Sequence, residues 1–362
     1  MTRLVVVSNR MPLGDNPSGG LVVALREQLA ADGGLWIGWN GEIVETPSET
    51  LIDIPGAPFA RKGFDMTQEE YDGYYLGFSN SVLWPLFHGR ADLLDLRPEY
   101  LTAYRAFNRR IARMIATELQ RDDRLWVHDY HLFPLAHKLR TLKVTSKIGH
   151  FLHIPFPSVQ DCLALPDLDL FAGWLAAYDL LGLQTHRDVA ALQEAFRMID
   201  DGELMLNGRV RYRDRVVQAA HFPIGIDVAG FAQIAAAQGP EPTAVQMQNG
   251  HLIIGVDRLD YSKGLPQRFR AFGHLLDRRP DLAGKVSLLQ IAPPTREEVK
   301  AYKDIREELE SLSGHINGAH ATLVCFDRGN RAVYGSEYER IGQCRVCERE
   351  ARVVSNGTLK QL

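Results

Sequence analysis

The sequence has few cysteines, little excess charge and no long apolar run. Four cysteines in 362 residues do not make a disulfide framework, which agrees with a reducing compartment. With 41 basic and 45 acidic residues the net charge is -4, and no long block of one sign occurs, so we expect neither nucleic acid nor a membrane surface as a partner. The start, MTRLVVVSNR, has too short an apolar run for a signal peptide or a membrane span. These absences predict a cytoplasmic globular protein.

A metal site has weak support. A single C-x-x-C pattern occurs, at Cys344 and Cys347, whereas a structural zinc site needs four ligands. The remaining candidates, Cys325, His315 and His320, are irregularly placed. We therefore expect no bound metal.

Strand-like and helix-like apolar patterns alternate, which predicts an α/β fold with parallel sheets. The length and the hydrophobic content of 45% are enough for two domains with a core in each. From Ala229 to Gly250 the pattern loosens into small and polar residues, so we expect a first domain over residues 1–235 and a second from residue 250. The expected strands include residues 3–8, 35–41, 178–185, 251–259 and 286–294, and the expected helices include 98–120, 187–200 and 297–312.

The stretch from Leu125 to Pro157 holds two buried-looking strands that each end in a side chain able to carry chemistry. The first run stops at Asp129, and the second stops at His153 before two prolines. In open parallel sheets, ligands bind outside the carboxyl ends of the strands, where both residues would lie. Taken singly, Asp129 could merely cap a helix and His153 could be a satisfied core histidine. Two such strand ends close together in sequence favour a functional role.

Another strand end lies near the N-terminus. The strand over residues 3–8 leads to Arg10 and then to a loop with Gly19 and Gly20, before a helical pattern begins. Glycine backbone at a helix N-terminus can approach a phosphate or sugar closely, and the helix dipole favours an anion there. Most glycine pairs are simple turns, but Arg10 at the same strand end strengthens the anion interpretation.

The segment from Tyr71 to Arg90 is unusually aromatic and lightly charged. Its rings include Tyr75 and Trp84. Such rings could belong to the core, because aromatic side chains bury large areas, or could form a platform for a sugar. Composition leaves both interpretations open.

Three cations lie at strand ends in the expected second domain. Arg258 and Lys263 flank a helix start marked by Gly264 and Pro266, which is a suitable place for a pyrophosphate. Arg296 follows the next strand. Each cation alone could be a solvated surface charge. Three of them at the ligand edge of one sheet predict an anion site.

Long motifs spread over about residues 1–318 resemble those of one family. They are VVSNR with a downstream SGGL, GFSNSVLWPLFH, WVHDYHL, FLHIPFP, PIGID, VDRLDYSKGLPQR, QIAPPTR and HINGAH. In these motifs the chain resembles the trehalose-6-phosphate synthases, retaining glucosyltransferases of family 20 with GT-B architecture. The resemblance implies two Rossmann-type domains. It also implies transfer of glucose from UDP-glucose to glucose 6-phosphate, giving trehalose 6-phosphate with retention at the anomeric carbon.

On the acceptor side, the resemblance implies that Arg10 and Arg296 hold the phosphate of glucose 6-phosphate. This is physically sensible, because guanidinium groups match the geometry of phosphate. Tyr75 would donate to the same phosphate, and Trp84 would shape the sugar pocket. Asp129 would bind hydroxyls of the acceptor sugar.

On the donor side, the resemblance implies that His153 contacts the donor glucose, while Arg258 and Lys263 neutralise the leaving diphosphate. Gly19 and Gly20 would let the N-terminal loop close on the donor. No protein nucleophile is generally assigned in this family, so positioning and charge stabilisation carry the catalysis. No cofactor or metal is implied, because Arg and Lys replace Mg²⁺, and formation of a homo-oligomer stays open.

After His320 the resemblance stops. A DGMNLVAKEY-like segment, whose acidic residues hold the donor glucose and ribose in the family, is not found in the sequence. We therefore expect a partial donor domain over residues 250–326 and an atypical tail over 327–362, as a truncated or frame-shifted gene would give. Two alternatives stay open beside the synthase. One is glucosylglycerol-phosphate synthesis from ADP-glucose and glycerol 3-phosphate on the same scaffold, and the other is a sugar-phosphate-binding protein without turnover.

Overall fold

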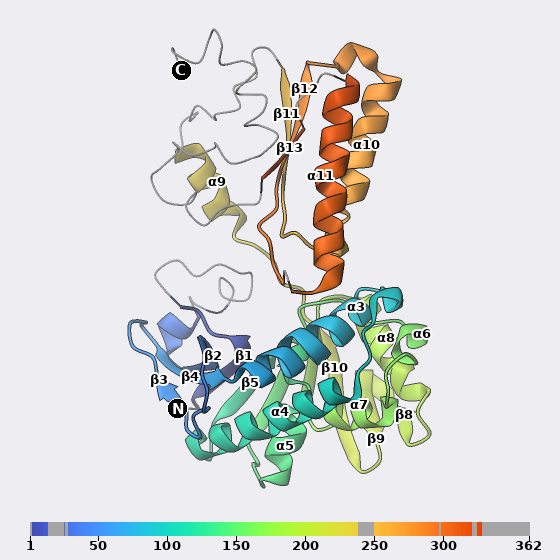
Figure 1. Cartoon of the computed structure of the whole chain (residues 1–362). Coiled ribbons are helices and arrows are strands. Elements are labelled where there is room, and N and C mark those ends of the chain that lie inside the picture. The colour runs from blue at the N-terminus through green and yellow to red at the C-terminus, as the bar shows by residue number, and fades with distance from the viewer. Residues whose placement is uncertain are drawn as a thin grey trace. The chain divides into compact units, whose positions relative to one another are not determined.

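The computed structural model describes residues 2–13, 25, 28–237, 250–296 and 298–320, together with the backbone of 324–327 (Figure 1). The chain divides into two compact units, Met1–Ile226 and Asp227–Leu362. The expected boundary between residues 229 and 250 differs from this division. Helix α9 (Val228–Ala237) covers the start of that stretch and belongs to the second unit. The stretch forms a helix because its alanines favour one even where the amphipathic pattern is weak. Cys344, Cys347 and the expected tail lie outside the described residues.

Unit 1 contains one ten-stranded sheet in the order β3-β4-β2-β1-β5-β6-β7-β10-β9-β8. In the centre of this order, each of the pairs β4–β2, β2–β1, β1–β5, β5–β6, β6–β7 and β7–β10 is parallel. This confirms the parallel centre of the fold. The bounds are β1 (Leu4–Arg10), β2 (Leu35–Ile43), β3 (Ile52–Asp53), β4 (Ala60–Met66), β5 (Arg124–His128), β6 (Lys147–Phe151), β7 (Leu180–Leu183), β8 (Gly202–Leu204), β9 (Arg209–Tyr212) and β10 (Arg215–His221).

The expected parallel arrangement holds in the centre of the sheet, whereas its edges are antiparallel. β3 is antiparallel to β4, and β8, β9 and β10 form an antiparallel meander. Only Arg213 and Asp214 separate β9 from β10, and so short a connection can join antiparallel strands but not parallel ones.

The helices of unit 1 lie mainly between the parallel strands in sequence. α4, α5 and α7 pack in turn along one face of the sheet (Figure 1). The helical segments are α2 (Gln68–Glu70), the π-helix η1 (Tyr71–Leu83), α3 (Trp84–Phe87), η2 (Ala91–Leu93), α4 (Pro98–Glu118), η3 (Tyr130–Leu132), α5 (Leu135–Thr141), α6 (Val159–Cys162), α7 (Leu168–Leu175), α8 (His186–Arg197) and η4 (Leu206–Gly208). The expected helices over residues 98–120 and 187–200 correspond to α4 and α8.

The central strands of the sheet are largely buried. Val5, Val6 and Val7 of β1 are each 0% exposed. A strand buried on both faces reads as a continuous apolar run rather than an alternating one, which explains why β1 was visible in the sequence.

Unit 2 holds a parallel three-stranded sheet in the order β11-β12-β13, with α10 and α11 drawn on the same side of it (Figure 1). Its elements are α9, β11 (His251–Val256), η5 (Tyr261–Lys263), α10 (Leu265–Arg278), η6 (Pro280–Leu282), β12 (Val286–Ile291), α11 (Lys300–His320) and β13 (Val324–Asp327). The core of this unit forms between α10, α11 and β12. Apolar residues of β11 stay exposed, among them Ile254 and Val256 at 59% each.

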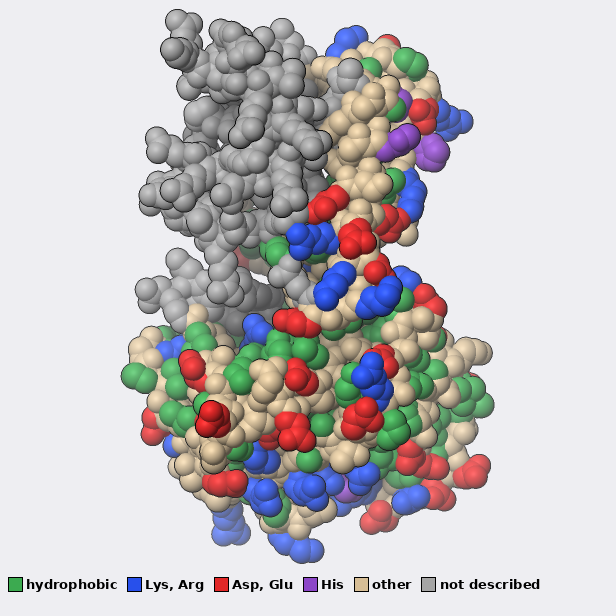
Figure 2. All heavy atoms as spheres, in the orientation of Figure 1, with side chains coloured by type: hydrophobic (Ala, Val, Ile, Leu, Met, Phe, Trp, Pro, Cys, Tyr) green, Lys and Arg blue, Asp and Glu red, His purple; other side chains and the backbone are tan. Residues whose placement is uncertain are grey.

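The surface carries charges of both signs. Figure 2 shows Lys or Arg and Asp or Glu side chains interspersed over much of the face drawn, with basic side chains gathered at the lower end of unit 1. In the described part of the chain, no helix combines the length and the apolar character needed to cross a membrane.

Arg110 anchors α4 to the start of the aromatic segment. Its guanidinium donates twice to the Glu70 carboxylate, with Nε to Oε1 at 2.8 Å and Nη2 to Oε2 at 2.7 Å. It also donates to the carbonyls of Asp65 and Ser48. Glu70 completes a capping box with Thr67, so the same carboxylate fixes where the helical segment begins.

We predict that Arg110→Ala lowers the free energy of unfolding of unit 1 by about 3–5 kcal/mol, because it leaves buried partners of an ion pair unpaired. All 5 tryptophans precede residue 227, so urea unfolding followed by tryptophan fluorescence reports on unit 1. Arg197→Ala, which removes an exposed pair with Glu194, is the matched control and should cost at most about 1 kcal/mol. Equal losses in the two variants would contradict this role of Arg110.

Candidate functional site

The strand order of unit 1 reverses between β1 and β5. From β1 the chain proceeds to β2 and β4 on one side, and from β5 it proceeds to β6, β7 and β10 on the other. Open α/β sheets bind ligands at the carboxyl ends of the strands at such a switch point. Arg10 ends β1 and Asp129 follows the last residue of β5, so both lie at this edge. The structure therefore places at one sheet edge two residues that are 119 positions apart in sequence.

Arg10 lies against aromatic rings. Its guanidinium carbon is 4.9 Å from the ring centre of Trp39 and 5.7 Å from that of Tyr75. Trp39 Nε1 donates to the carbonyl of Glu42 at 3.0 Å, which fixes the indole ring. Arg10 itself is exposed. The rings thus orient a guanidinium group that stays accessible to an anion.

The π-helix η1 holds Tyr75, and Trp84 begins α3 directly after it. Gly73 and Gly77 allow α4 to approach closely, because a Cβ on Gly77 would lie 2.5 Å from the Tyr100 ring.

Residues of η1 and of α3 pack on the turn that follows Asp129. The ring of Tyr75 stacks on His131 at 5.8 Å, and Trp84 contacts the ring of Tyr130 at 5.7 Å. Tyr130 also donates to Asn80 Oδ1 at 3.0 Å. The aromatic segment therefore supplies core residues and also holds Tyr75 beside Arg10, while its role as a platform for a sugar stays a prediction.

Asp129 has a strained backbone. Its φ of 70° is rare for a residue other than glycine. Its N–H donates to the carbonyl of Phe151 at 2.8 Å, and its carbonyl accepts from His150 Nε2 at 3.1 Å. Although Asp129 precedes η3, its side chain makes no capping bond, so the alternative role as a helix cap is wrong. Strain of this kind is held by the surroundings and clusters at functional sites.

His153 lies two residues after β6 and is half-buried. Its Nε2 is 3.0 Å from Nδ1 of His128, the last residue of β5. Burial lowers the pKa of His153, although the charge of Asp129 opposes this effect. Burial also lowers the pKa of His128 far below its usual value and that of His150 to about 3. The edge thus presents neutral imidazoles beside Asp129.

In unit 2 the expected cations follow β11 and β12. Arg258 and Lys263 are exposed, and Gly264 precedes α10 with a left-handed φ of 64°, which glycine adopts without strain. Pro266 lies in the first turn of α10, so the expected helix start is confirmed.

Arg296 is not a solvated surface charge. Its side chain is 6% exposed, and Nη1 lies 3.6 Å from Oδ2 of Asp260, which is fully buried. Tyr302 bridges the two, since it accepts from Arg296 Nη1 at 2.5 Å and donates to Asp260 Oδ2 at 3.1 Å. The guanidinium is thus held by a buried carboxylate and a phenol at the end of β12.

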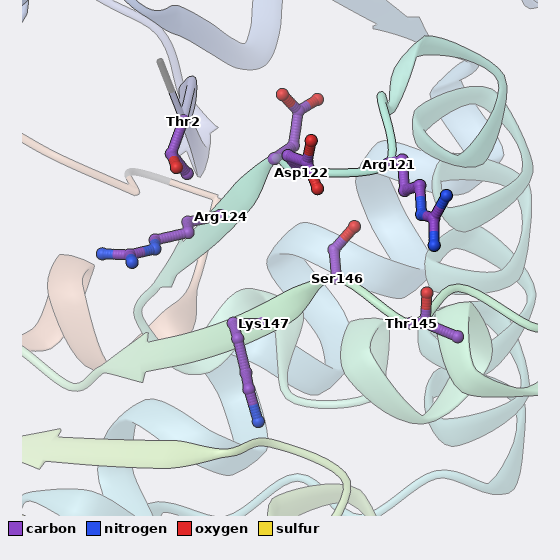
Figure 3. A pocket seen from close by; sticks show the side chains of 8 residues that line it. Thr2, Arg121, Asp122, Arg124, Thr145, Ser146 and Lys147 are labelled. Atoms are coloured by element: carbon purple, nitrogen blue, oxygen red, sulfur yellow. The ribbon is translucent and has the colours of Figure 1, made fainter.

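Two pockets lie along the sheet of unit 1. A polar pocket of about 400 Å³ lies at the amino ends of β5 and β6, where Figure 3 shows Arg121, Arg124 and Lys147 pointing away from one another. An apolar pocket of about 700 Å³ runs along β5 and β6 and reaches His153. Neither gathers cations around one point, so neither is a better candidate for a phosphate site.

Comparison with known proteins identifies the family of the chain. The sequence profile of glycosyltransferase family 20 matches residues 8–326. The trehalose-6-phosphate synthase of Sodalis glossinidius is 42% identical over 330 residues, which cover 89% of this chain and 70% of that protein. The chain belongs to glycosyltransferase family 20.

Solved structures of similar proteins include ligand complexes. A UDP-forming trehalose-phosphate synthase from Burkholderia xenovorans in complex with glucose-6-phosphate has a TM-score of 0.84 and 39% identity. The match covers 92% of this chain and 76% of that one. An E. coli structure bound with UDP-2-fluoro glucose has a TM-score of 0.84 and 38% identity over 91% of this chain and 74% of that one.

Sequence reasoning missed several residues that the structure places beside the predicted site residues. Trp39, His128 and His150 had no motif of their own, and Asp260 was noticed only as part of a longer motif. One signal was available in the sequence: Trp126 and His128 are two positions apart in a strand, so they are expected on the same face of the sheet. Gly19 and Gly20 lie outside the described residues. Within the described ranges, no three His, Cys, Asp or Glu side chains are grouped to hold a metal ion, and independence of metal stays a prediction.

We predict that unit 1 loses stability as the pH falls below about 6.5, where histidines of the unfolded chain take up protons but the buried ones do not. His150 alone should contribute up to about 1.4 kcal/mol per pH unit between about pH 6.5 and its lowered pKa of about 3. Urea unfolding at pH 7.5, 6 and 5 measures this slope.

The dependence of the free energy of unfolding on pH should become weaker in His150→Phe. It should stay unchanged in His186→Phe, which replaces an exposed histidine. A parent protein equally stable at pH 7.5 and 5 would contradict the burial of neutral imidazoles in unit 1.

Proposed function

We propose that this chain carries out the trehalose-6-phosphate synthase reaction, in which glucose passes from UDP-glucose to glucose 6-phosphate with retention. The family and the identity of about 40% with synthases support this reaction. The observation that carries it is the arrangement at the switch point, where Arg10 lies over Trp39 and beside Tyr75 at the same sheet edge as Asp129. An anion site beside an aromatic wall and a carboxylate suits a sugar phosphate.

On the acceptor side, Arg10 binds the phosphate, and Tyr75 adds a phenolic donor. Asp129 accepts from sugar hydroxyls, which a carboxylate can do at both oxygens. Trp84 is 4% exposed and packs against Tyr130, so it shapes the pocket by holding this turn. Arg296 contributes the second guanidinium to the phosphate, as the family resemblance implies.

On the donor side, His153 contacts the glucose, and Arg258 and Lys263 neutralise the diphosphate as it leaves. Negative charge grows on that group in the transition state, so fixed cations lower the barrier. Lys263 lies directly before Gly264 and the N-terminus of α10, where the helix dipole also favours an anion. No step in this scheme requires a metal ion or a protein nucleophile.

The architecture we propose is GT-B, with unit 1 as the acceptor domain and unit 2 as the donor domain. The large sheet of unit 1 and the parallel sheet of unit 2 support this assignment. A partial donor domain is supported by the three-stranded sheet and by the exposed apolar residues of β11. The cytoplasmic location stays a prediction.

Product analysis tests the function. The full chain is incubated with each of UDP-glucose and ADP-glucose and each of glucose 6-phosphate and glycerol 3-phosphate, and products are identified by mass. We expect trehalose 6-phosphate and UDP from one combination, at a rate that added EDTA does not change. A product that contains glycerol, or binding of glucose 6-phosphate without any turnover, would contradict the proposal.

We predict that Arg10→Ala weakens binding of glucose 6-phosphate by about 1.5–3 kcal/mol, the range of a charge-assisted hydrogen bond. Binding of free glucose should change much less, because glucose lacks the phosphate. Arg10→Lys should recover part of the loss, since it keeps the charge without the planar guanidinium. Calorimetry measures the affinity of the parent and of both variants for each ligand. If Arg10→Ala weakened binding of glucose 6-phosphate and of glucose equally, Arg10 would not bind the phosphate.

Arg296→Ala should show the same preference for the phosphorylated ligand. This variant also leaves the buried carboxylate of Asp260 without its cation, so unit 2 should lose stability. The double variant Arg296→Ala with Asp260→Asn removes that charge and separates the two effects. If binding recovers in the double variant, Arg296 acts only through stability and its proposed role is wrong.

A further inference from the structure

Two imidazoles meet at the carboxyl edge of the sheet in unit 1. His128 ends β5, and His153 follows the parallel neighbour β6. His128 Nδ1 and His153 Nε2 are 3.0 Å apart, a hydrogen-bond distance that needs one donor and one acceptor. The rings of Trp126 and Phe151 flank His128 at 4.7 and 6.4 Å and restrict its orientation.

Both imidazoles are neutral at neutral pH, because burial lowers the pKa of each. A neutral imidazole has one N–H and one bare nitrogen, so the contact between the rings holds a single proton. That proton belongs either to His128 Nδ1 or to His153 Nε2. The two arrangements differ in what His153 offers to a ligand through Nδ1.

The other nitrogen of His128 decides between them. His128 Nε2 is buried and has no hydrogen-bond partner among the described residues. If His153 donated, His128 Nε2 would carry a buried N–H without an acceptor, and orphaned buried donors are rarer than orphaned acceptors. If His128 donates from Nδ1, its Nε2 is a bare nitrogen and no donor is left unpaired.

We infer that His128 is a positioning residue that holds His153 as its Nδ1–H tautomer, so that His153 offers a hydrogen-bond donor at the site. His153 is not fully buried, and its Nδ1 makes no hydrogen bond to the described residues. The chemical partner is an oxygen that accepts, such as a hydroxyl or ring oxygen of the donor sugar. This last step rests on the proposed function, whereas the tautomer does not.

His150 supplies an internal reference. Its Nε2 lies 3.1 Å from the carbonyl oxygen of Asp129, and a carbonyl can only accept. His150 is therefore the Nε2–H tautomer. His128 and His153 should both differ from it, since each carries its proton on Nδ1.

Nitrogen NMR of the parent chain tests the tautomers without any variant that must fold. The chain is labelled with ¹⁵N-histidine, and two-bond ¹H–¹⁵N correlations at pH 7.5 identify the protonated nitrogen of each ring. We expect Nδ1–H at His128 and His153 and Nε2–H at His150. Nε2–H at His153 would overturn the inference, whatever the activity of the chain.

Substitutions at His128 test the positioning role. His128→Asn places an amide N–H near the position of Nδ1 and should keep His153 as Nδ1–H. His128→Phe fills the space without a donor and should release His153 to its Nε2–H tautomer. His137→Phe, on α5 and outside the site, is the matched control and should leave His153 unchanged. An unchanged tautomer in His128→Phe would contradict the role.

Ligand binding separates this inference from the proposed function. By calorimetry, His128→Phe should weaken binding of UDP-glucose about tenfold while UDP alone binds as before, because only the glucose reaches His153. His128→Asn should stay within about threefold of the parent. Equal weakening for both ligands would overturn the positioning role. Failure of the parent to bind either ligand would refute the proposed function and leave the NMR result to decide the tautomer.

Discussion

The hydrogen bonding between β1 and β5 is the constraint on which the site depends. These strands are far apart in sequence, and their parallel register pairs Leu4 with Arg124 and Val7 with Val127. Because the strand order reverses here, the chain goes on from β1 to one side of the sheet and from β5 to the other, and a ligand is expected between the carboxyl ends of this pair. A slip of one residue would turn every side chain of β5 to the opposite face and remove His128 from His153.

The π-helix is the second constraint, and it depends on tertiary contacts rather than on local propensity. A wide turn is poorly stable alone, so its 13 residues need external support. Arg110 and Glu70 fix its start, and Asn80 Nδ2 and Ser81 Oγ donate to carbonyls five residues earlier. Arg110 is therefore tied to the sheet edge that carries Arg10 without touching it, through the position of Tyr75 in η1.

Strand ends and helix starts could be predicted from the sequence because their signals are local. Asp129 and His153 were found because apolar runs stop there, and the start of α10 was found from Gly264 and Pro266. The π-helix, the buried state of Arg296 and the pairing of His128 with His153 could not be predicted, because each depends on residues that meet only in the folded chain. The antiparallel edge was missed because short strands carry weak patterns.

The two units offer different chemistry, and the difference follows from burial. At the edge of unit 1 the imidazoles are kept neutral by desolvation, and Arg10 stays exposed, so this edge suits hydroxyl groups and one anion. In unit 2, Arg296 is buried yet stays charged because the buried carboxylate of Asp260 compensates it. Neutral groups discriminate sugars by the direction of hydrogen bonds, whereas fixed cations stabilise charge that develops on phosphate. A glycosyl transfer from a nucleotide sugar needs both, which is why neither set of residues alone defines the function.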